Sequence, residues 1–182
     1  MDNFREEVAV RHNAGLYGFL YVLAWVALVV LALTAMIGLS GVMAMFSAGF
    51  SLGPVILLVV NGGLAFLVYR YKDELKCEYE YAFTNGDLDV SKVLNNTRRR
   101  YLTSLPMKTV EAAGPVNHPS FQRYVTMQGV KKHNWFLNRA AKLYYFYFVK
   151  AGVKHLMIVE LSDEMVGLVK RPNYMNYGIW QA

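Results

Sequence analysis

The stretch from Asn13 to Tyr69 decides the architecture of this chain. It reads NAGLYGFLYVLAWVALVVLALTAMIGLSGVMAMFSAGFSLGPVILLVVNGGLAFLVY and contains no Asp, Glu, Lys, Arg or His. An apolar run of about 18 residues already indicates a membrane span, and a bilayer core of roughly 30 Å needs about 20 helical residues. The stretch is too long for one span and has room for two spans and a turn. It therefore predicts a transmembrane helical hairpin over residues 15–69.

The two spans are expected at about residues 15–37 and 52–69. The small, uncharged, glycine-dotted segment 38–53 is interpreted as the turn between them. Both spans are long enough to cross a bilayer with slight tilt.

A polar triplet, Asn61-Gly62-Gly63, falls near the middle of the second span. An amide in hydrocarbon is costly unless it is hydrogen-bonded, so Asn61 is expected to face the other span or a second protomer. Asn61, Gly62 and Gly63 are therefore the candidate intramembrane packing residues. Packing against a second protomer, in a homo-oligomer formed through the hairpin, is the alternative to packing within one chain.

Basic residues flank both spans but are missing from the turn. They are Arg5 and Arg11 before the first span, and Arg70, Lys72 and Lys76 after the second. Loops rich in Lys and Arg stay on the cytoplasmic side of a membrane. The sequence therefore predicts a multi-pass protein of the plasma membrane with both termini in the cytoplasm.

The N-terminal residues 1–14 carry mixed charge and make a poor signal peptide. Phe4 and Val8 are four positions apart, as are Glu7 and Arg11. This spacing favours a short amphipathic turn that lies at the membrane interface.

Residues 75–182 are predicted to form one cytoplasmic domain that is mostly β. From residue 70 onward the chain carries 17 Lys and Arg against 10 Asp and Glu. Alternation of charged and aromatic residues from Glu78 to Phe83 indicates a half-buried strand, and Asn85-Gly86 indicates a hairpin turn. A return strand, a turn at 95–97 and a third strand over 98–104 are expected to follow.

The rest of the domain is expected to contain a strand over 121–127, a polar excursion over 128–142 with a helical turn near Trp135, and a final hairpin around Ala151-Gly152. Ser162-Asp163-Glu164 is expected to cap a C-terminal helix that ends near Lys170. The predicted fold class is α+β: a two-helix transmembrane hairpin, then an antiparallel β-barrel or sandwich closed by a C-terminal helix.

Four stretches carry a family resemblance. They are the hairpin YEYAFTNGDLDV, the basic strand RRRYL, the hairpin YYFYFVKAGVKHLMIVEL and the helix SDEMVGLVKR. Together with FREEVAVR and two spans, they resemble a family of small bacterial two-span membrane proteins that end in a pleckstrin-homology-like (PH-like) domain. The resemblance implies a barrel with a helix at one open end, and it lends no chemistry, because fold does not imply function.

The motifs of enzymes and of metal or cofactor sites are missing from the sequence. His12, His118, His133 and His155 are scattered, Cys77 is the single cysteine, and no phosphate-binding glycine loop or nucleophile elbow occurs. We therefore expect no enzyme, no catalytic or metal-binding residues, and no cofactor.

Positive charge is the feature that points to function. The candidate patch for lipid or a partner comprises Arg98, Arg100, Lys108, Lys131 and Lys132. A basic face can bind anionic lipid of the inner leaflet or a protein, or can simply be solvated. Nucleic acid is disfavoured because no motif that reads it is present. We expect a non-catalytic membrane adaptor or scaffold; the alternative is an accessory subunit of a membrane transporter or enzyme complex.

Overall fold

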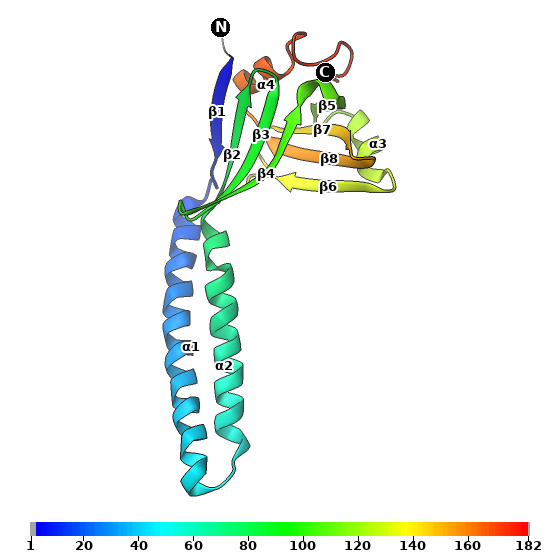
Figure 1. Cartoon of the computed structure of the whole chain (residues 1–182). Coiled ribbons are helices and arrows are strands. Elements are labelled where there is room, and N and C mark those ends of the chain that lie inside the picture. The colour runs from blue at the N-terminus through cyan, green and yellow to red at the C-terminus, as the bar shows by residue number, and fades with distance from the viewer. Residues whose placement is uncertain (1–2, 182) are drawn as a thin grey trace. The chain divides into compact units, whose positions relative to one another are not determined.

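A computed structural model describes residues 3–181 of the chain. The chain divides into two compact units (Figure 1). One unit is the continuous segment Asn13–Cys77, and the other joins the N-terminal segment up to His12 to the chain from Glu78 onward. The second unit is therefore built from the chain segments that precede and follow the first unit in the sequence.

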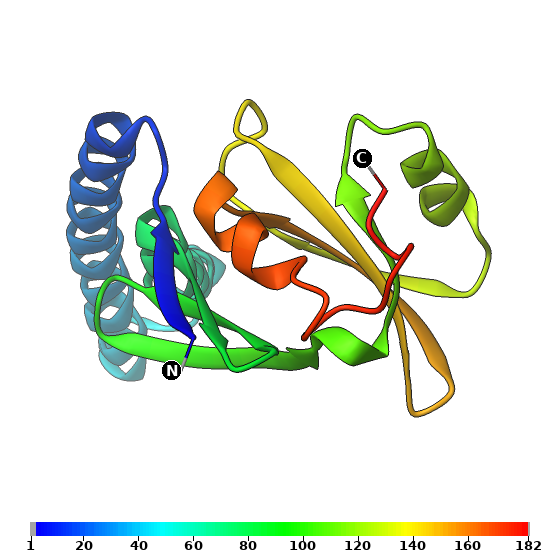
Figure 2. The same cartoon turned by 90° about the horizontal axis from the view of Figure 1, so that it is seen from above.

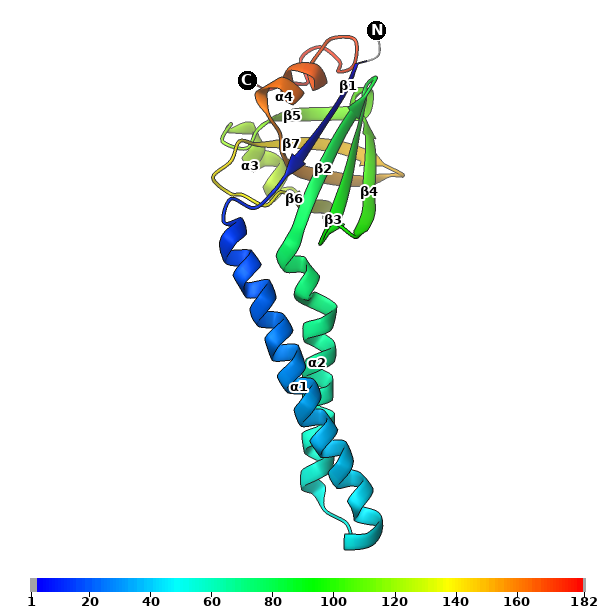
Figure 3. The same cartoon turned by 90° about the vertical axis from the view of Figure 1, so that its left-hand side faces the viewer.

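The unit Asn13–Cys77 is a hairpin of two antiparallel helices, α1 (Ala14–Ala48) and α2 (Leu52–Tyr71), followed by a 3-10 turn, η1 (Lys72–Lys76) (Figure 3). By length and composition both helices could cross a membrane, and few of their residues are buried within the chain. The expected hairpin is confirmed as a fold, and its helices are longer than the predicted segments 15–37 and 52–69.

The predicted turn over 38–53 is wrong for most of its length, because α1 continues to Ala48 and the loop is short. Polar side chains of this segment are satisfied inside the helix. The Ser40 hydroxyl donates to the Met36 carbonyl over 3.0 Å, and the Ser47 hydroxyl donates to Ala44 over 3.1 Å. Such bonds to the preceding turn let serine remain in an apolar helix.

Glycines of α1 allow the two helices to approach closely. A Cβ added at Gly38 would lie 2.6 Å from the backbone nitrogen of Leu58, and one at Gly41 would lie 2.7 Å from Pro54 Cβ. Small residues at a helix crossing are typical of membrane hairpins, since only they let the backbones meet.

The predicted packing triplet does not lie at this crossing. The Asn61 side-chain amide donates over 2.8 Å to the Leu57 carbonyl of its own helix, and a Cβ at Gly62 or Gly63 would meet nothing within 4 Å. The expected bond from Asn61 to the other helix is therefore replaced by a bond within α2, and the glycines that pack the hairpin are those of α1.

Aromatic rings of the hairpin surround the lysine that follows α2. The Lys72 ammonium lies 4.6 Å from the ring centre of Trp25, 5.2 Å from that of Tyr69 and 5.6 Å from that of Tyr21. Lys72 is buried and pairs with Asp73 over 2.8 Å. The cluster joins the two ends of the hairpin through cation–π contacts.

The second unit is a sandwich of two four-stranded sheets with two short helices (Figure 2). The first sheet has the order β1-β2-β3-β4, and its strands are β1 (Phe4–Ala9), β2 (Cys77–Thr84), β3 (Asp87–Leu94) and β4 (Arg98–Pro106). The second has the order β5-β7-β8-β6, with strands β5 (Val110–Pro115), β6 (Val130–Trp135), β7 (Leu143–Lys150) and β8 (Val153–Glu160). The turn η2 (Met107–Thr109) joins the sheets, and the helices are α3 (Ser120–Thr126) and α4 (Asp163–Val169).

The N-terminal segment is a strand of this sandwich, so the predicted interfacial turn over residues 1–14 is wrong for the described residues. β1 pairs with β2 in antiparallel register from Phe4 opposite Thr84 to Ala9 opposite Tyr79. The predicted domain boundary at residue 75 changes with it, because a domain of residues 75–182 would lack its edge strand. The helical hairpin is thus an insertion between two neighbouring strands.

The core lies between the two sheets. Alternation in β2 buries Tyr79, Tyr81 and Phe83 and leaves the residues between them on the outer face. Met165 and Val169 of α4 are fully buried, so the helix contributes to the same interior. Together these features confirm the predicted α+β class with a PH-like sandwich and a C-terminal helix.

The turns expected from sequence are present. Asn85 and Gly86 have φ values of 51° and 109°, and Ala151 and Gly152 have values of 50° and 75°. Two consecutive positive φ angles are the geometry of the type I′ turn, which suits the twist of a two-residue hairpin.

Two predictions for the segment 121–142 are wrong. The expected strand over 121–127 is the helix α3, whose residues Phe121, Tyr124 and Val125 pack with Tyr145 and Tyr147 on the second sheet. Their spacing of three and four is helical. The polar excursion that follows contains β6, which pairs in parallel with β8.

The glycines of the hairpin supply a matched test. In the full chain in detergent, Gly38→Ala should lower the unfolding free energy by about 1–3 kcal/mol, because the new methyl group meets the backbone of Leu58. Gly62→Ala makes the same change where nothing lies within 4 Å. Thermal unfolding followed by circular dichroism compares the two. Equal melting temperatures for both variants would show that the crossing does not run through Gly38.

Candidate functional site

The predicted basic patch divides into separate groups. Arg98 and Arg100 begin β4, whereas Lys108 lies in η2 beyond the other end of that strand. A strand of this length spans roughly 30 Å, so Lys108 does not share a site with the arginines. Lys131 and Lys132 lie on β6 in the second sheet.

The pairing of β3 with β4 places the arginines on two faces, as alternation predicts. Arg98 lies opposite Leu94 and Arg100 opposite Lys92, while Arg99 lies opposite Val93. Arg99 forms ion pairs with Glu80 and, at 3.4 Å, with Glu6. Arg99, which is not part of the candidate patch, therefore links β4 to acidic residues of β1 and β2.

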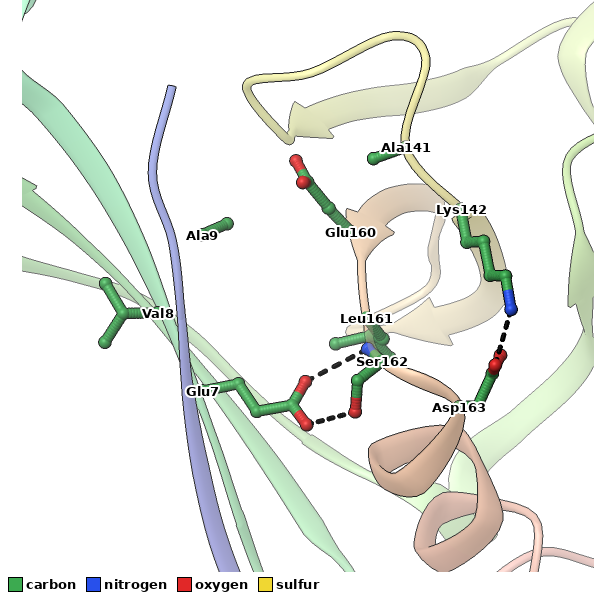
Figure 4. A pocket seen from close by; sticks show the side chains of 9 residues that line it. All are labelled: Glu7, Val8, Ala9, Ala141, Lys142, Glu160, Leu161, Ser162 and Asp163. Carbon is green, nitrogen blue, oxygen red and sulfur yellow. Dashed lines mark hydrogen bonds and ion pairs between the residues drawn. The ribbon is translucent and has the colours of Figure 1, made fainter. Parts of the chain in front are cut away.

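A pocket of about 590 Å³ opens where β1 meets the end of β8 and the start of α4 (Figure 4). Its lining residues come from β1, the loop before β7 and the β8–α4 junction: Glu7, Val8, Ala9, Ala141, Lys142, Glu160, Leu161, Ser162 and Asp163. Three carboxylates and one lysine give it a polar wall.

Glu7 is the centre of the bonding in this pocket. It accepts hydrogen bonds from the backbone N–H of Ser162 over 3.0 Å, from the Ser162 hydroxyl, and from the guanidinium of Arg5 over 2.8 Å. The same Ser162 hydroxyl accepts from Met165 N over 3.1 Å and so caps α4. Burial alone would raise the pKa of Glu7, but the bonds from Ser162 and Arg5 outweigh it and lower that pKa.

A second bridge in the same corner runs through Asn138. Its side-chain amide donates to Glu160 over 3.0 Å and to the Val10 carbonyl over 2.8 Å, and its side-chain oxygen accepts from His12 N over 2.9 Å. Asn138 thereby ties the end of β8 to the segment that follows β1.

The polar groups of the pocket already have partners within the chain. Lys142 and Asp163 form an ion pair (Figure 4), in addition to the bonds that Glu7 and Glu160 make. A general acid or base needs a carboxylate that can reach a substrate, and these carboxylates are engaged in holding strands and a helix. The arrangement is that of a clamp between the N-terminal strand and the C-terminal helix.

Histidines give two local contacts. His118 Nδ1 lies 2.7 Å from the Ser120 hydroxyl, which lies 2.7 Å from the Tyr145 hydroxyl. Because Ser120 N also donates to His118 Nδ1, this contact orders the first turn of α3. Over residues 3–181, no group of three or more His, Cys, Asp and Glu is placed to hold a metal ion.

Sequence reasoning missed the second contact, between His133 and His155. His133 Nε2 lies 2.9 Å from His155 Nδ1 across two neighbouring strands. The residues are far apart in the chain and belong to a parallel strand pair, so no spacing rule relates them. Only the placement of β6 beside β8 could have revealed the pair.

The pocket yields a prediction about pH. The pKa of Glu7 is lowered in the folded chain, so its contribution to stability is present above the unfolded value of about 4.3 and is lost as pH falls toward the folded value. Glu7→Gln should therefore lower the unfolding free energy of the full chain by about 1–3 kcal/mol at neutral pH, and the difference from wild type should shrink below about pH 4.

Denaturant unfolding at several pH values measures this difference. Glu6→Gln is the matched control, because the neighbouring Glu6 is more exposed and its one ion pair with a residue in the range 3–181 is a long contact with Arg99. A Glu7→Gln effect that is the same at low and neutral pH would contradict the assigned role of the carboxylate.

A family model described as Bacterial PH-like domain (DUF6106) matches residues 1–177. No curated protein and no solved structure matched. The matched region contains β1, the helical hairpin, both sheets and α4, so the insertion between β1 and β2 lies inside the family model. The resemblance inferred from the sequence is confirmed: the chain belongs to this family of bacterial PH-like domains.

Proposed function

We propose that the chain is a non-catalytic integral membrane protein whose PH-like domain binds a partner protein or anionic headgroups. One observation carries the proposal: the apolar hairpin leaves the sandwich after β1 and returns to it at β2, and these strands are hydrogen-bonded neighbours. A domain attached in this way is held by two connections. Such attachment favours a module that presents a surface at the membrane.

The pairing of β1 with β2 also bears on topology. Paired strands lie in one compartment, so a hairpin between them crosses the bilayer an even number of times. The basic residues flank the hairpin at both ends: Arg5, Arg11, Arg70, Lys72 and Lys76. By the positive-inside rule, this distribution supports a topology with the domain and both termini in the cytoplasm and the loop between α1 and α2 outside.

Reporter fusions test this topology. A reporter that is active only outside the cytoplasm should be active when inserted at Phe50, in the loop between α1 and α2, and inactive at the C-terminus. A cytoplasm-only reporter should give the opposite pattern and serves as the control. Activity of the external reporter at the C-terminus would overturn the assignment.

Basic side chains support binding to an anionic partner. Arg98 and Arg100 lie on one face of β4, beside the turn from β3. The antiparallel β2–β3 hairpin places this turn at the end of the sheet where β2 begins. Each basic residue near an anionic surface contributes on the order of 1 kcal/mol to attraction, so this end of the sheet suits contact with headgroups or an acidic protein.

The alternative function is that of an accessory subunit, in which the hairpin itself docks with a transporter or enzyme complex. Exchanging Ala14–Tyr71 for an unrelated two-span hairpin separates the two functions. Partners bound by the domain should remain after affinity purification from membranes, as measured by quantitative mass spectrometry. The hairpin alone with a tag, Asn13–Cys77, is the reciprocal control. Loss of every partner on exchange, with recovery by the hairpin alone, would favour the accessory subunit.

A further inference from the structure

The parallel pairing of β6 with β8 gathers basic and imidazole groups at one end of the second sheet. In this register Lys131 lies opposite His155, and His133 lies opposite Met157. The last residue of β7 adds Lys150, which lies opposite Val153. By alternation Lys131, His133 and His155 share one face, and Lys132 lies on the other.

Aromatic rings hold the two imidazoles in place. The rings of His133 and His155 are stacked at 13°, with 5.2 Å between their centres. Phe148 stacks on His155 at 8° and 5.3 Å, and Trp135 lies 4.8 Å from His133. The edge of the imidazole pair is thus preorganised by packing from β6, β7 and β8.

The bond between the rings depends on protonation. A hydrogen bond between His133 Nε2 and His155 Nδ1 needs one donor and one acceptor, so both rings cannot be charged while it is made. Burial lowers the pKa of His133, with further lowering by His155 and Lys131. Burial also lowers the pKa of His155, with further lowering by Lys131 and Lys150. A bound anion would reverse the electrostatic part of both shifts.

The charges that surround the pair are mostly positive. Lys131 and Lys150 are exposed, and neither forms an ion pair with any residue in the described range 3–181. On the elements packed alongside, β5 carries Glu111, and α3, which packs on the opposite face of the sheet, carries Arg123. Two lysines beside two titratable rings form an incomplete cradle for an anion.

We propose that Lys131, Lys150, His133 and His155 form a binding site for a phosphate group, free or carried by a lipid headgroup, that binds more tightly as pH falls. The lysines attract the anion, and protonation gives both rings N–H donors that point to it instead of to each other. The inference rests on the proposed role of the domain as a binding module, and it names the ligand chemistry and the site.

The test uses the full chain in phosphatidylcholine nanodiscs with ¹³C-labelled histidine. Sulfate is the probe, because its two negative charges do not titrate near neutral pH. Saturating sulfate should raise the pKa of His133 and His155 measured by NMR and leave the signals of His12 and His118 unchanged. By linkage, sulfate should bind about tenfold more tightly at about pH 5.5 than at about pH 7.5.

Variants separate the site from general surface charge. Lys131→Gln combined with Lys150→Gln should weaken sulfate binding by at least about tenfold. Lys108→Gln, an equal charge change per residue on η2, should leave binding unchanged. Unchanged shifts of the His12 and His118 signals show that each variant is folded. An equal response of all four histidines to sulfate, or wild-type binding by the double variant, would overturn the site.

A lipid arm identifies the source of the phosphate. Nanodiscs that contain phosphatidylglycerol should shift the signals of His133 and His155 without sulfate if the chain's own bilayer supplies the headgroup. A shift with sulfate alone assigns the site to free anions. If neither sulfate nor phosphatidylglycerol shifts these signals, the anion site is refuted. The hairpin exchange can still show that the domain binds a partner, so the two proposals are tested independently.

Discussion

The antiparallel ladder between β1 and β2 is the constraint on which the rest of the structure depends. It joins Ala9 to Tyr79 across the whole helical hairpin, so residues on both sides of that hairpin belong to one sheet. Removal of β1 would expose the edge of β2, and an unpaired edge strand is a template for aggregation. Ser162, whose backbone N–H donates to Glu7, and Asn138, whose side chain donates to the Val10 carbonyl, reinforce this ladder from the C-terminal part of the chain.

Local and strongly patterned features could be predicted from the sequence. The uncharged run from Asn13 to Tyr69 indicated two helices, and Asn85-Gly86 indicated a turn whose two residues have positive φ. Ser162 was expected to cap the last helix, and its hydroxyl accepts the N–H of Met165. Each of these features depends on neighbours in sequence, so propensity and periodicity were sufficient to find it.

Features that depend on distant partners were missed. Phe4 and Val8 have helical spacing, and the partner that makes their segment a strand lies beyond the hairpin. β6 lacks a clear alternation because it is an edge strand whose neighbour, β8, pairs with it in parallel. The predicted basic patch divides for a similar reason: it rests on clusters of positive charge in the sequence, whereas in the fold Arg98 begins β4 and Lys108 lies beyond its other end. The contact between His133 and His155 could not be predicted, because it exists only where the fold places β6 beside β8.

The insertion of the hairpin between β1 and β2 also determines when the first sheet can assemble during translation. β1 leaves the ribosome first and has no partner in its sheet until β2 follows. The residues between Ala9 and Tyr79 take roughly 3–15 s to translate. On the proposed topology both spans enter the bilayer in that time, because β1 and β2 can pair only when the chain has returned to the side on which it started. A chain in which only one span crosses has β1 and β2 on opposite sides of the membrane, so completion of the first sheet excludes that error, and such a chain is left with an open edge that proteases and chaperones can recognise.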